Sequence, residues 1–577
     1  MLSYRKLAMC VLGRPLHTGG GIDLPRPASQ RAAAFILTAA MLITLAAPAF
    51  AGTWYIEDGD ITVKAGETKG TNKVSQGANQ EVEDTDTIIK NREDTASSNT
   101  VTIETNDKND KVEVTLKDVN IEATGGKAAV SVTGKGDTTI ELDGDNALKS
   151  DIYSSGISSS GSLTISGGET DSLTAQGGSG ENGGDGIFSF GRVAISGGTV
   201  NATGGVGSSR NGGSGIYSSN SSVTISGGTV NAAGGNGNFS GGCGIYNSGS
   251  LIISDGTVNA TGGNGKDGYG GYGISSSDVA ISGGTVNANG GDSKDGYGGN
   301  GISSSSGVAI SDGTVNANGG DSKNGSGGSG IFSFDRVAAI SGGTVNANGG
   351  NGGSGDGGDG IRSFAPVAIS GGAVTANGGS GNSSGGNGIY SRNDIDLSGS
   401  LELTAKAGSP NGKALSQNDK ELDLDTIKDK LGPGAKVTAT DADGKVNQVP
   451  IPRPVEPEKP VIPEESSSSS DGGSAAPSAP VSPLPGLTVT DKSGAVISYT
   501  STQSGNTLTV CVGRFTASFR ISLAALRQLR AEGIETITFQ TILCSTTLSV
   551  DELLAMGGED AEAVLTHRLT DSSLTVG

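Results

Sequence analysis

Apolar and polar residues alternate in short runs along the middle of the chain, and one such pattern returns at a nearly constant interval. The first regular copy is Val-Ala-Ile-Ser-Gly-Gly-Thr-Val-Asn-Ala-Thr-Gly-Gly over residues 193–205. Its isoleucine returns every 28 to 30 residues, at Ile195, Ile225, Ile253, Ile281, Ile310, Ile340 and Ile369. A fixed period of this length is typical of a solenoid, in which each unit buries its apolar face against its neighbours.

Each repeat is expected to contain three short strands. Val193 and Ile195 are separated by one residue, so they point to the same side of a strand. Val200 and Ala202 do the same after a glycine pair that allows the backbone to turn. The third strand begins at a Gly-Ile pair, whose isoleucines are Ile187, Ile216, Ile245, Ile274, Ile302, Ile331, Ile361 and Ile389. We therefore predict an all-β fold, a parallel β-helix with columns of small apolar side chains along its axis.

Composition changes on both sides of the coils. Short strand-like runs in residues 52–110 predict an N-terminal cap, the coils span 111–405, and residues 406–448 predict a C-terminal cap. Residues 450–485 hold ten of the 17 prolines and a five-serine run, so 449–486 is predicted to be an extended linker. Strand-like runs around a helix-like segment in 487–577 predict a small α+β domain.

The N-terminus indicates the compartment. Arg26 and Arg31 precede an apolar run over 32–47, and Ala49-Phe50-Ala51 follows it with the small-x-small pattern of a cleavage site. This order predicts a signal peptide over residues 1–51. A retained anchor helix is the alternative, because the run approaches the ~20 residues that span a bilayer. We expect an exported protein, extracellular or at the cell surface, without membrane insertion after signal cleavage.

Composition and charge narrow the class of partner. The 577 residues include 100 glycines and only 4% aromatic residues, which suits a thin solenoid core better than a large globular one. The formal net charge of −21 disfavours nucleic acid, which requires a basic surface. It equally disfavours simple electrostatic binding to anionic lipid.

Several phrases resemble a known group of proteins. They are Val-Thr-Leu-Lys-Asp-Val-Asn-Ile at 114–121, Ile-Glu-Leu at 140–142 and the repeated Leu-Thr-Ile-Ser-Gly-Gly units. Together they resemble the secreted bacterial carbohydrate-binding right-handed β-helix family, whose fold is similar to that of pectate lyases. The resemblance covers roughly residues 100–405 and implies a right-handed helix that binds polysaccharide, with bound calcium. The glycine-rich connections depart from the family pattern, so no metal ligand is transferred.

Outward-facing residues give two candidate glycan surfaces. In stacked coils, ~4.8 Å apart, threonine and asparagine would form a flat polar strip; alternatively, such residues bond only to one another. The strip comprises Thr199, Asn201, Thr229, Asn231, Thr257, Asn259, Thr285, Asn287, Thr314, Asn316, Thr344 and Asn346. On another face, Phe188, Tyr217, Tyr246, Phe332 and Tyr390 form an aromatic row. Tyr217 and Tyr246 are its candidate glycan contacts, and the alternative is that these rings cover glycine loops.

Acidic loop residues and two cysteines are the candidates for a metal site and a disulfide. Calcium prefers carboxylate and carbonyl oxygens, so the acidic residues of the glycine loops are its one candidate location, with solvated turns as the alternative. These residues are Asp185, Asp267, Asp292, Asp295, Asp321, Asp356 and Asp359. No cofactor is expected to be required. An exported protein permits Cys511 and Cys544 to form a disulfide.

Three functions follow from these observations. The first is a secreted, non-catalytic protein whose partner is a polysaccharide or cell-wall glycan. The second is a structural, adhesin-like surface solenoid that acts as a spacer. The third is a polysaccharide lyase-like enzyme. No repeat breaks the pattern with a dense charged cluster, so no catalytic residue is predicted and the first function is preferred.

Overall fold

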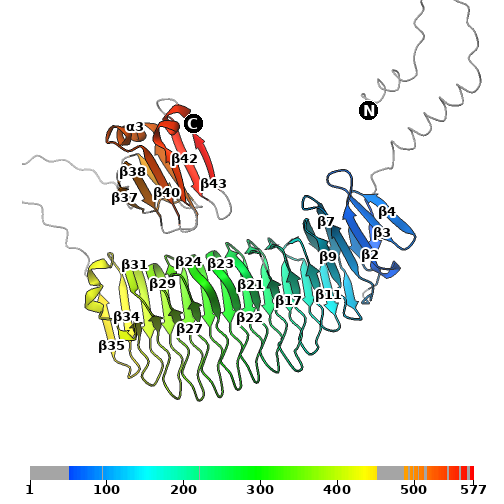
Figure 1. The fold of residues 1–577 in the computed structure, drawn as a ribbon, viewed down its shortest axis with the longest axis horizontal. Coiled ribbons are helices and arrows are strands. Elements are labelled where there is room, and N and C mark those ends of the chain that lie inside the picture. The colour runs from blue at the N-terminus through cyan, green and yellow to red at the C-terminus, as the bar shows by residue number, and fades with distance from the viewer. Residues whose placement is uncertain are drawn as a thin grey trace, which may run out of the picture. The chain divides into compact units, whose positions relative to one another are not determined.

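The structure is a computed structural model that describes residues 51–93, 95–219, 221–450, 486–490, 494–497, 499–504, 506–512, 516–541, 545–557, 561–567 and 572–576. It is 52% strand and 5% helix, with a parallel β-solenoid of about 14 turns and a small C-terminal β/α region (Figure 1). The predicted parallel β-helix is confirmed. Residues 1–50 and 451–485, which hold almost all of the predicted signal peptide and linker, lie outside the described residues.

Three parallel ladders run along the solenoid, one for each predicted strand of the repeat. The Gly-Ile ladder contains β2 (Ile61–Ala65), β6 (Val101–Thr105), β9 (Val130–Gly134), β12 (Ile157–Ser159), β15 (Ile187–Ser189), β18 (Ile216–Ser218), β25 (Ile331–Ser333), β28 (Ile361–Ser363), β30 (Ile389–Ser391) and β32 (Leu415–Gln417). The Val-Ile ladder contains β1 (Thr53–Tyr55), β5 (Ile88–Lys90), β7 (Lys111–Lys117), β10 (Asp137–Asp143), β13 (Ser162–Gly167), β16 (Val193–Ile195), β19 (Val223–Ile225) and β26 (Ala338–Ile340).

The Thr-Asn ladder carries the polar strip predicted from the sequence. It contains β8 (Asn120–Ala123), β11 (Asp145–Ser150), β14 (Ser172–Gln176), β17 (Thr199–Thr203), β20 (Thr229–Ala233), β22 (Thr257–Thr261), β27 (Thr344–Asn348) and β34 (Lys436–Thr440). Some strands continue through a corner and join more than one ladder, namely β21 (Ile245–Ile253), β23 (Ile274–Asn289), β24 (Ile302–Asn318), β29 (Val367–Asn377) and β31 (Ile395–Lys406).

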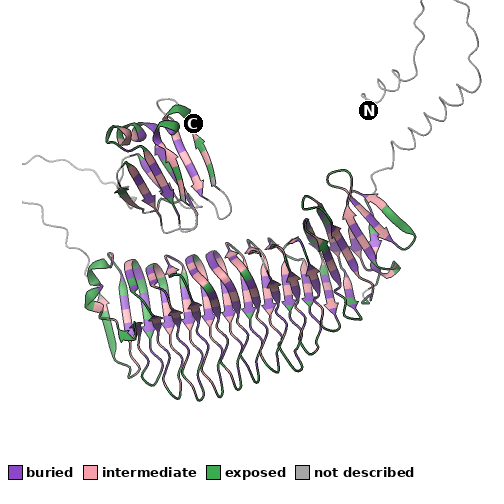
Figure 2. Ribbon diagram, viewed as in Figure 1, coloured by how far each residue is buried: buried purple, intermediate pink, exposed green. Residues whose placement is uncertain are grey.

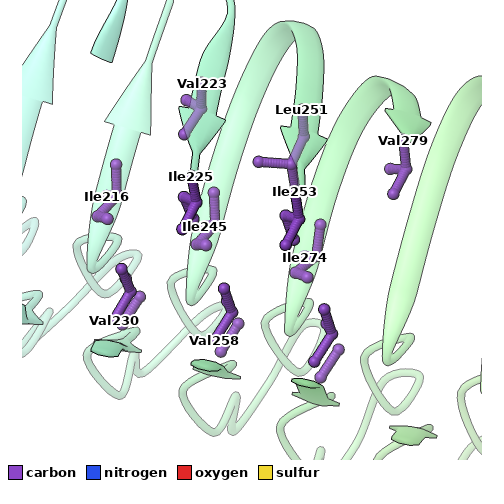
Figure 3. Close-up of a cluster of buried hydrophobic side chains, with 14 of the residues drawn as sticks. Ile216, Val223, Ile225, Val230, Ile245, Leu251, Ile253, Val258, Ile274 and Val279 are labelled. Atoms are coloured by element: carbon purple, nitrogen blue, oxygen red, sulfur yellow. The ribbon is translucent and has the colours of Figure 1, made fainter. Parts of the chain in front are cut away.

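The core is a set of aliphatic columns that follow the solenoid axis (Figure 3), and buried residues recur along the strands of successive coils (Figure 2). In one coil, Ile216, Val223, Ile225 and Val230 are all fully buried. The equivalent residues of the next coil stack directly on them, as the step from Ile216 to Ile245 shows. Fully burying such a side chain stabilises a fold by about 1.5–3 kcal/mol. Small aliphatic residues repeated in every coil therefore make up nearly all of the core, which Trp54 joins near the N-terminal end.

Antiparallel hairpins cover both ends of the solenoid. At the N-terminal end, β3 (Asn72–Gln76) and β4 (Asn79–Asp84) extend β2. At the C-terminal end, β33 (Lys420–Glu421) and β35 (Val446–Pro450) pair with β32 and β34, near the short 3-10 helices η2 (Leu424–Thr426) and η3 (Lys428–Lys430). Parallel pairing already begins with β1 and β2, so coil structure extends into the segment interpreted as a cap.

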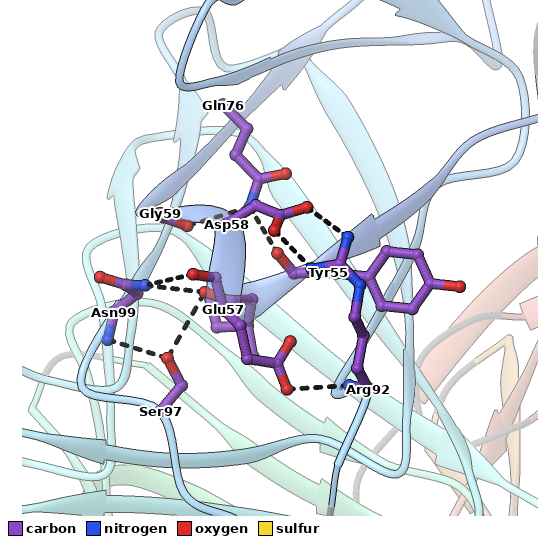
Figure 4. Close-up of polar contacts among 9 residues, drawn as sticks. Tyr55, Glu57, Asp58, Gly59, Gln76, Arg92, Ser97 and Asn99 are labelled. Carbon is purple, nitrogen blue, oxygen red and sulfur yellow. Dashed lines mark hydrogen bonds and ion pairs between the residues drawn. The ribbon is translucent and has the colours of Figure 1, made fainter.

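Polar contacts join the first strand to the chain that follows it (Figure 4). The guanidinium of Arg92 donates to Asp58 Oδ2 at 2.6 Å and lies 4.2 Å from the ring centroid of Tyr55. The pKa of Asp58 is lowered by this hydrogen bond. The side-chain amide of Gln76 donates to the carbonyls of Tyr55 and Gly59. These contacts hold the 3-10 helix η1 (Ile56–Asp58) at the start of the solenoid.

The glycine-rich connections form a further hydrogen-bonded layer, which the sequence indicated only as loops. Gly242 donates its N–H to Gly235 of the same connection at 2.9 Å, and Gly235 donates to Gly213 of the preceding coil at 2.8 Å. We call this alternating series the glycine zigzag; it includes Gly205, Gly213, Gly235, Gly242, Gly263, Gly271, Gly291, Gly299, Gly320, Gly328, Gly350, Gly358, Gly379, Gly386 and Gly408. A Cβ on Gly242 would lie 1.9 Å from the Gly213 oxygen, so this close approach requires glycine.

The C-terminal region contains two four-stranded sheets and two helices. One sheet has the order β36 (Leu487–Thr490), β39 (Ala517–Ser522), β42 (Glu562–His567), β43 (Ser572–Val576), and the other β37 (Thr500–Ser504), β38 (Thr507–Cys511), β40 (Thr536–Gln540), β41 (Ser545–Ser549). Ser522 caps α3 (Leu523–Ala531) and Ser549 caps α4 (Val550–Met556). The buried rings of Phe519 and Phe539 lie 4.8 Å apart in its core. The predicted α+β character is confirmed.

Candidate functional site

The asparagines of the predicted polar strip bond to one another. Asn231 Nδ2 donates to Asn201 Oδ1 at 2.8 Å, and Asn259 Nδ2 donates to Asn231 Oδ1 at 2.8 Å. The series continues through Asn287, Asn316 and Asn346 at 2.7 to 2.8 Å. A second series that the sequence analysis did not identify joins Asn289, Asn318, Asn348 and Asn377 at 2.8 Å. These amides stabilise the stack, as asparagine ladders do.

The threonines of the strip stack in register beside the asparagines. Thr199, Thr229, Thr257, Thr285, Thr314 and Thr344 are direct partners in successive coils. All of them retain some solvent exposure, which agrees with the predicted alternation. The strip is thus flat and regular, and its asparagine amides already use part of their hydrogen-bonding capacity within the protein.

Carboxylates of the glycine connections accept hydrogen bonds from backbone N–H groups of the next coil. Asp292 Oδ1 accepts the N–H of Asp321 at 2.9 Å, and Asp321 Oδ1 accepts the N–H of Asn351 at 2.6 Å. In a neighbouring column, Asp185 Oδ1 accepts the N–H of Ser214 at 2.6 Å. In the part of the chain that the structure describes, no group of three or more His, Cys, Asp or Glu is placed to hold a metal ion. Calcium at these loops stays a prediction.

The aromatic row lies on the outer face of the Gly-Ile ladder and begins with three stacked rings. The ring centroids of Phe188 and Tyr217 are 5.4 Å apart with planes 22° apart, and those of Tyr217 and Tyr246 are 4.8 Å and 16° apart. The next residues in this column are Ser275 and Ser303, followed by Phe332. A serine is too small to cover the ring below it. The stack therefore ends with one face of Tyr246 uncovered.

A trough of about 270 Å³ lies where the stack is interrupted. We call it the serine trough; its lining residues are Tyr246, Asn247, Ser248, Ser275, Ser276, Ser277, Ser303, Ser304, Ser305, Phe332 and Phe334. Three strand spacings separate Tyr246 from Phe332, which corresponds to roughly 14 Å. The trough thus has an aromatic ring at each end and hydroxyl groups along its floor.

At the far end of the trough, Phe332 and Phe334 pack against a third phenylalanine, Phe364, which lies outside the trough lining. The ring centroid of Phe364 lies 5.6 Å from that of Phe332 and 5.3 Å from that of Phe334, with edge-on geometry in both pairs. Phe334 is 47% exposed. Edge-on packing is a favourable arrangement of aromatic quadrupoles, so the cluster fixes the position of Phe332 while leaving apolar surface open to solvent.

The floor of the trough can both donate and accept hydrogen bonds. The Ser277 hydroxyl donates to the Ser248 carbonyl at 2.6 Å, which leaves its oxygen lone pairs as acceptors. Ser303 Oγ accepts a long bond of 3.4 Å from Asn300. Among the described residues, Ser275 has no hydrogen-bond partner for its hydroxyl. Outward serines on two adjacent coils therefore present free hydrogen-bonding capacity between two apolar walls.

A second hollow of about 420 Å³ adjoins the trough and shares Phe332 with it. We call it the tyrosine hollow, because the exposed rings of Tyr269 and Tyr297 stack at its edge with centroids 5.6 Å apart. Its lining also includes Arg362, which donates to Asp359 Oδ2 at 2.9 Å and lies over the ring of Tyr390 at 5.0 Å. Burial raises the pKa of Asp359, and the charge of Arg362 opposes that rise.

A cavity of about 510 Å³ lies between the N-terminal cap and the first coils. It extends over the outer faces of β7 and β10 and is lined by cations such as Lys111 and Arg192 together with carboxylates such as Glu113 and Asp137. Its lining contains no aromatic residue. Ligand sites for sugars need an apolar surface with a few polar groups, so this cavity has a different chemical character from the trough.

The structure brings together only part of what the sequence analysis singled out. Tyr217 and Tyr246 belong to one stack, whereas the Thr-Asn strip lies on a different ladder. The serines of the trough were missed, although serine at the position after Gly-Ile in two consecutive repeats was a visible signal. Cys511 contacts Gln540, and Cys544 lies outside the described residues, so their pairing stays a prediction.

Comparisons with known proteins agree with the solenoid. A family model described as a beta helix repeat matches residues 193–216, 223–245, 251–278, 279–306 and 308–330, which include Ser275 and Ser303 of the serine trough but neither Tyr246 nor Phe332. The chain is similar to that repeat family in this region. No curated protein and no solved structure matches the chain. None of the helices in the described part of the chain has the length and hydropathy of a membrane span.

Proposed function

We propose that this chain is a secreted or cell-surface polysaccharide-binding protein without catalytic activity, and that glycan binds in the serine trough. The observation that carries the proposal is the interrupted stack, in which Tyr246 and Phe332 face a hydroxyl floor between them. The C–H groups of a sugar ring carry partial positive charge and pack well on the negative face of an aromatic ring. Sugar hydroxyls then pair with the serines of the floor.

The same lining supports binding without catalysis. Glycoside cleavage usually needs a pair of carboxylates on either side of the bond. The residues that line the trough are serine, asparagine, tyrosine and phenylalanine, and the tyrosine hollow adds only Asp356 as a carboxylate. Beta helix repeats occur in both lyases and non-enzymes, so the proposal rests on the lining of these hollows.

A direct test removes the two aromatic ends. Retention of the full chain on a panel of immobilised polysaccharides identifies a ligand, and calorimetry then compares it with the variant Tyr246→Ala/Phe332→Ala. We expect at least tenfold weaker binding, because each stacked ring contributes about 0.5–1.5 kcal/mol beyond its buried area. Phe239→Ala removes a ring that is 51% exposed and lines neither hollow, so it is the matched control and should bind as wild type does. Equal affinity of the double variant would contradict the proposal.

A second candidate function is a stiff surface spacer. It is favoured by the asparagine ladders and the glycine zigzag, which bond each coil to the next without any ligand. If the chain is retained on none of the polysaccharides in the panel, the spacer function is favoured. If incubation with pectin produces the absorbance of unsaturated uronates, the chain would instead be a lyase.

A further inference from the structure

We infer that the serine trough selects neutral polysaccharides and discriminates against polyanionic ones, with the glycan chain running along the solenoid axis. This inference rests on the proposed function and names its ligand class. It starts from the charge of the lining, which contains no Asp, Glu, Lys, Arg or His. Both walls and the floor are therefore uncharged.

An acidic sugar would find no partner for its charge in the trough. Burying a carboxylate without a cation or several hydrogen bonds is costly, and charge-assisted pairing with Arg or Lys is the usual way proteins hold one. Two arginines follow the aromatic end of the trough along the chain, and both have carboxylate partners. Arg362 is paired with Asp359 at 2.9 Å, and Arg336 lies 3.9 Å from Asp278.

The charge of the whole chain acts in the same direction. A formal net charge of −21 repels a polyanion over distances up to the Debye length, about 8 Å at physiological ionic strength. A neutral glycan experiences no such repulsion. Its hydroxyls both donate and accept hydrogen bonds, which matches the serine hydroxyls of the floor.

The ladder order sets the direction of the bound chain. Tyr246, Ser275, Ser303 and Phe332 follow one another in a single column across four coils. A glycan that contacts both rings must cross the strands and lie along the axis. Beyond Phe332 the same track reaches the tyrosine hollow. Affinity is therefore expected to rise with oligosaccharide length until both rings are engaged.

The test compares polymers that differ only in charge. A β-glucan, a mannan and a galactan are each used in neutral form and after oxidation of the C6 hydroxymethyl group to a carboxylate, with the full chain in calorimetry at physiological salt. At least one neutral polymer should bind at least tenfold more tightly than its oxidised partner. A Ser275→Lys variant should reduce the ratio of neutral to oxidised polymer affinity several-fold, because it supplies a cation at the floor of the trough.

The possible failures are distinguishable. Equal or tighter binding of the oxidised polymers by the wild type would overturn the inference and leave polysaccharide binding intact. An unchanged ratio in Ser275→Lys, with retained binding, would place the ligand away from the trough and also overturn it. Absence of binding to all six polymers would overturn the proposed function itself.

Discussion

Ser275 and Ser276 are neighbours in the chain, yet their hydroxyls serve opposite sides of the same sheet. Ser275 faces the trough, whereas Ser276 is 4% exposed and its one hydroxyl proton lies between two acceptors, the carbonyl oxygens of Gly249 and Asp278, each 2.8 Å from Oγ. The period-two alternation of a strand produces this division. The Ser275 hydroxyl is therefore available to a ligand, whereas the Ser276 hydroxyl, although it borders the trough, is bonded within the protein.

This pair gives a prediction in which neighbouring substitutions have different effects. Ser275→Ala should weaken glycan binding several-fold and leave stability unchanged. Ser276→Ala should lower the free energy of unfolding by about 1 kcal/mol, because a buried hydrogen-bonded hydroxyl is lost. It should weaken glycan binding less than Ser275→Ala does, because the Ser276 hydroxyl is already bonded within the protein. Calorimetry and urea denaturation of both variants check this. If Ser276→Ala weakened binding more than Ser275→Ala, the assignment of the floor would be wrong.

The asparagine ladder is predicted to be structural. Asn287 donates to Asn259 at 2.7 Å and accepts from Asn316 at 2.8 Å, so Asn287→Ala removes two hydrogen bonds. We expect the free energy of unfolding to fall by about 1–3 kcal/mol, with unchanged affinity for any glycan that binds the trough. A loss of affinity without loss of stability would instead assign glycan binding to the Thr-Asn strip.

The glycine zigzag is predicted to be sensitive to a single methyl group. In Gly242→Ala the new Cβ would meet the Gly213 carbonyl oxygen at 1.9 Å, and the two stacked connections would have to separate. We expect a loss of at least about 1–3 kcal/mol in urea denaturation, the range for overpacked sites. Lys266→Ala, an exposed position in the next connection, is the control and should change stability by less than about 0.5 kcal/mol. Similar midpoints for the two variants would refute this role.

Stability is predicted to depend on pH through Asp185. Burial raises the pKa of Asp185 to about 7, whereas an unfolded aspartate has a pKa of about 3.9. Between these values the folded state binds a proton that the unfolded state releases. The free energy of unfolding therefore falls as pH rises through this window, by on the order of 4 kcal/mol.

Asp185→Asn isolates this effect. Asn300, in the equivalent position of a later coil, accepts the Ser329 N–H at 2.8 Å, so asparagine fits this column. The variant should be more stable than wild type at pH 8 and nearly equal to it at pH 4. The measurement is the difference between the urea midpoints of the variant and of wild type, taken at pH 8 and at pH 4. A difference that does not change with pH would show that Asp185 does not titrate in this range.

Much of the architecture could be predicted from the sequence, because it depends on local alternation. The period of the isoleucines predicted the length of each coil. The spacing of Val200 and Ala202 predicted which face of the strand is buried. The trough was not predicted, because it forms where the coil after Tyr246 carries a serine in place of an aromatic ring. The small residue Ser275 becomes informative only once the coils are stacked in register.

The glycine connections show a second limit of sequence reasoning. Gly235 and Gly242 were expected to lie in a loop, since glycine favours turns. Gly242 donates to Gly235, and Gly235 donates to Gly213 of the preceding coil. Both hydrogen bonds form only when each connection folds back on itself and stacks on the connection of the coil before it. The loop aspartates were similarly expected to be solvated or to bind calcium. In the structure Asp292 instead accepts a backbone N–H from the next coil, a partner defined only by the stacking of coils.

The most direct measurement is a crystal structure of the chain with a bound neutral oligosaccharide that was selected by its affinity. Sugar rings should lie over Ser275 and Ser303 along the solenoid axis, with one ring against the open face of Tyr246 and another against Phe332. Ordered sugar on the Thr-Asn strip or in the cap cavity, with the serine trough free of it, would show that the trough is not the glycan site.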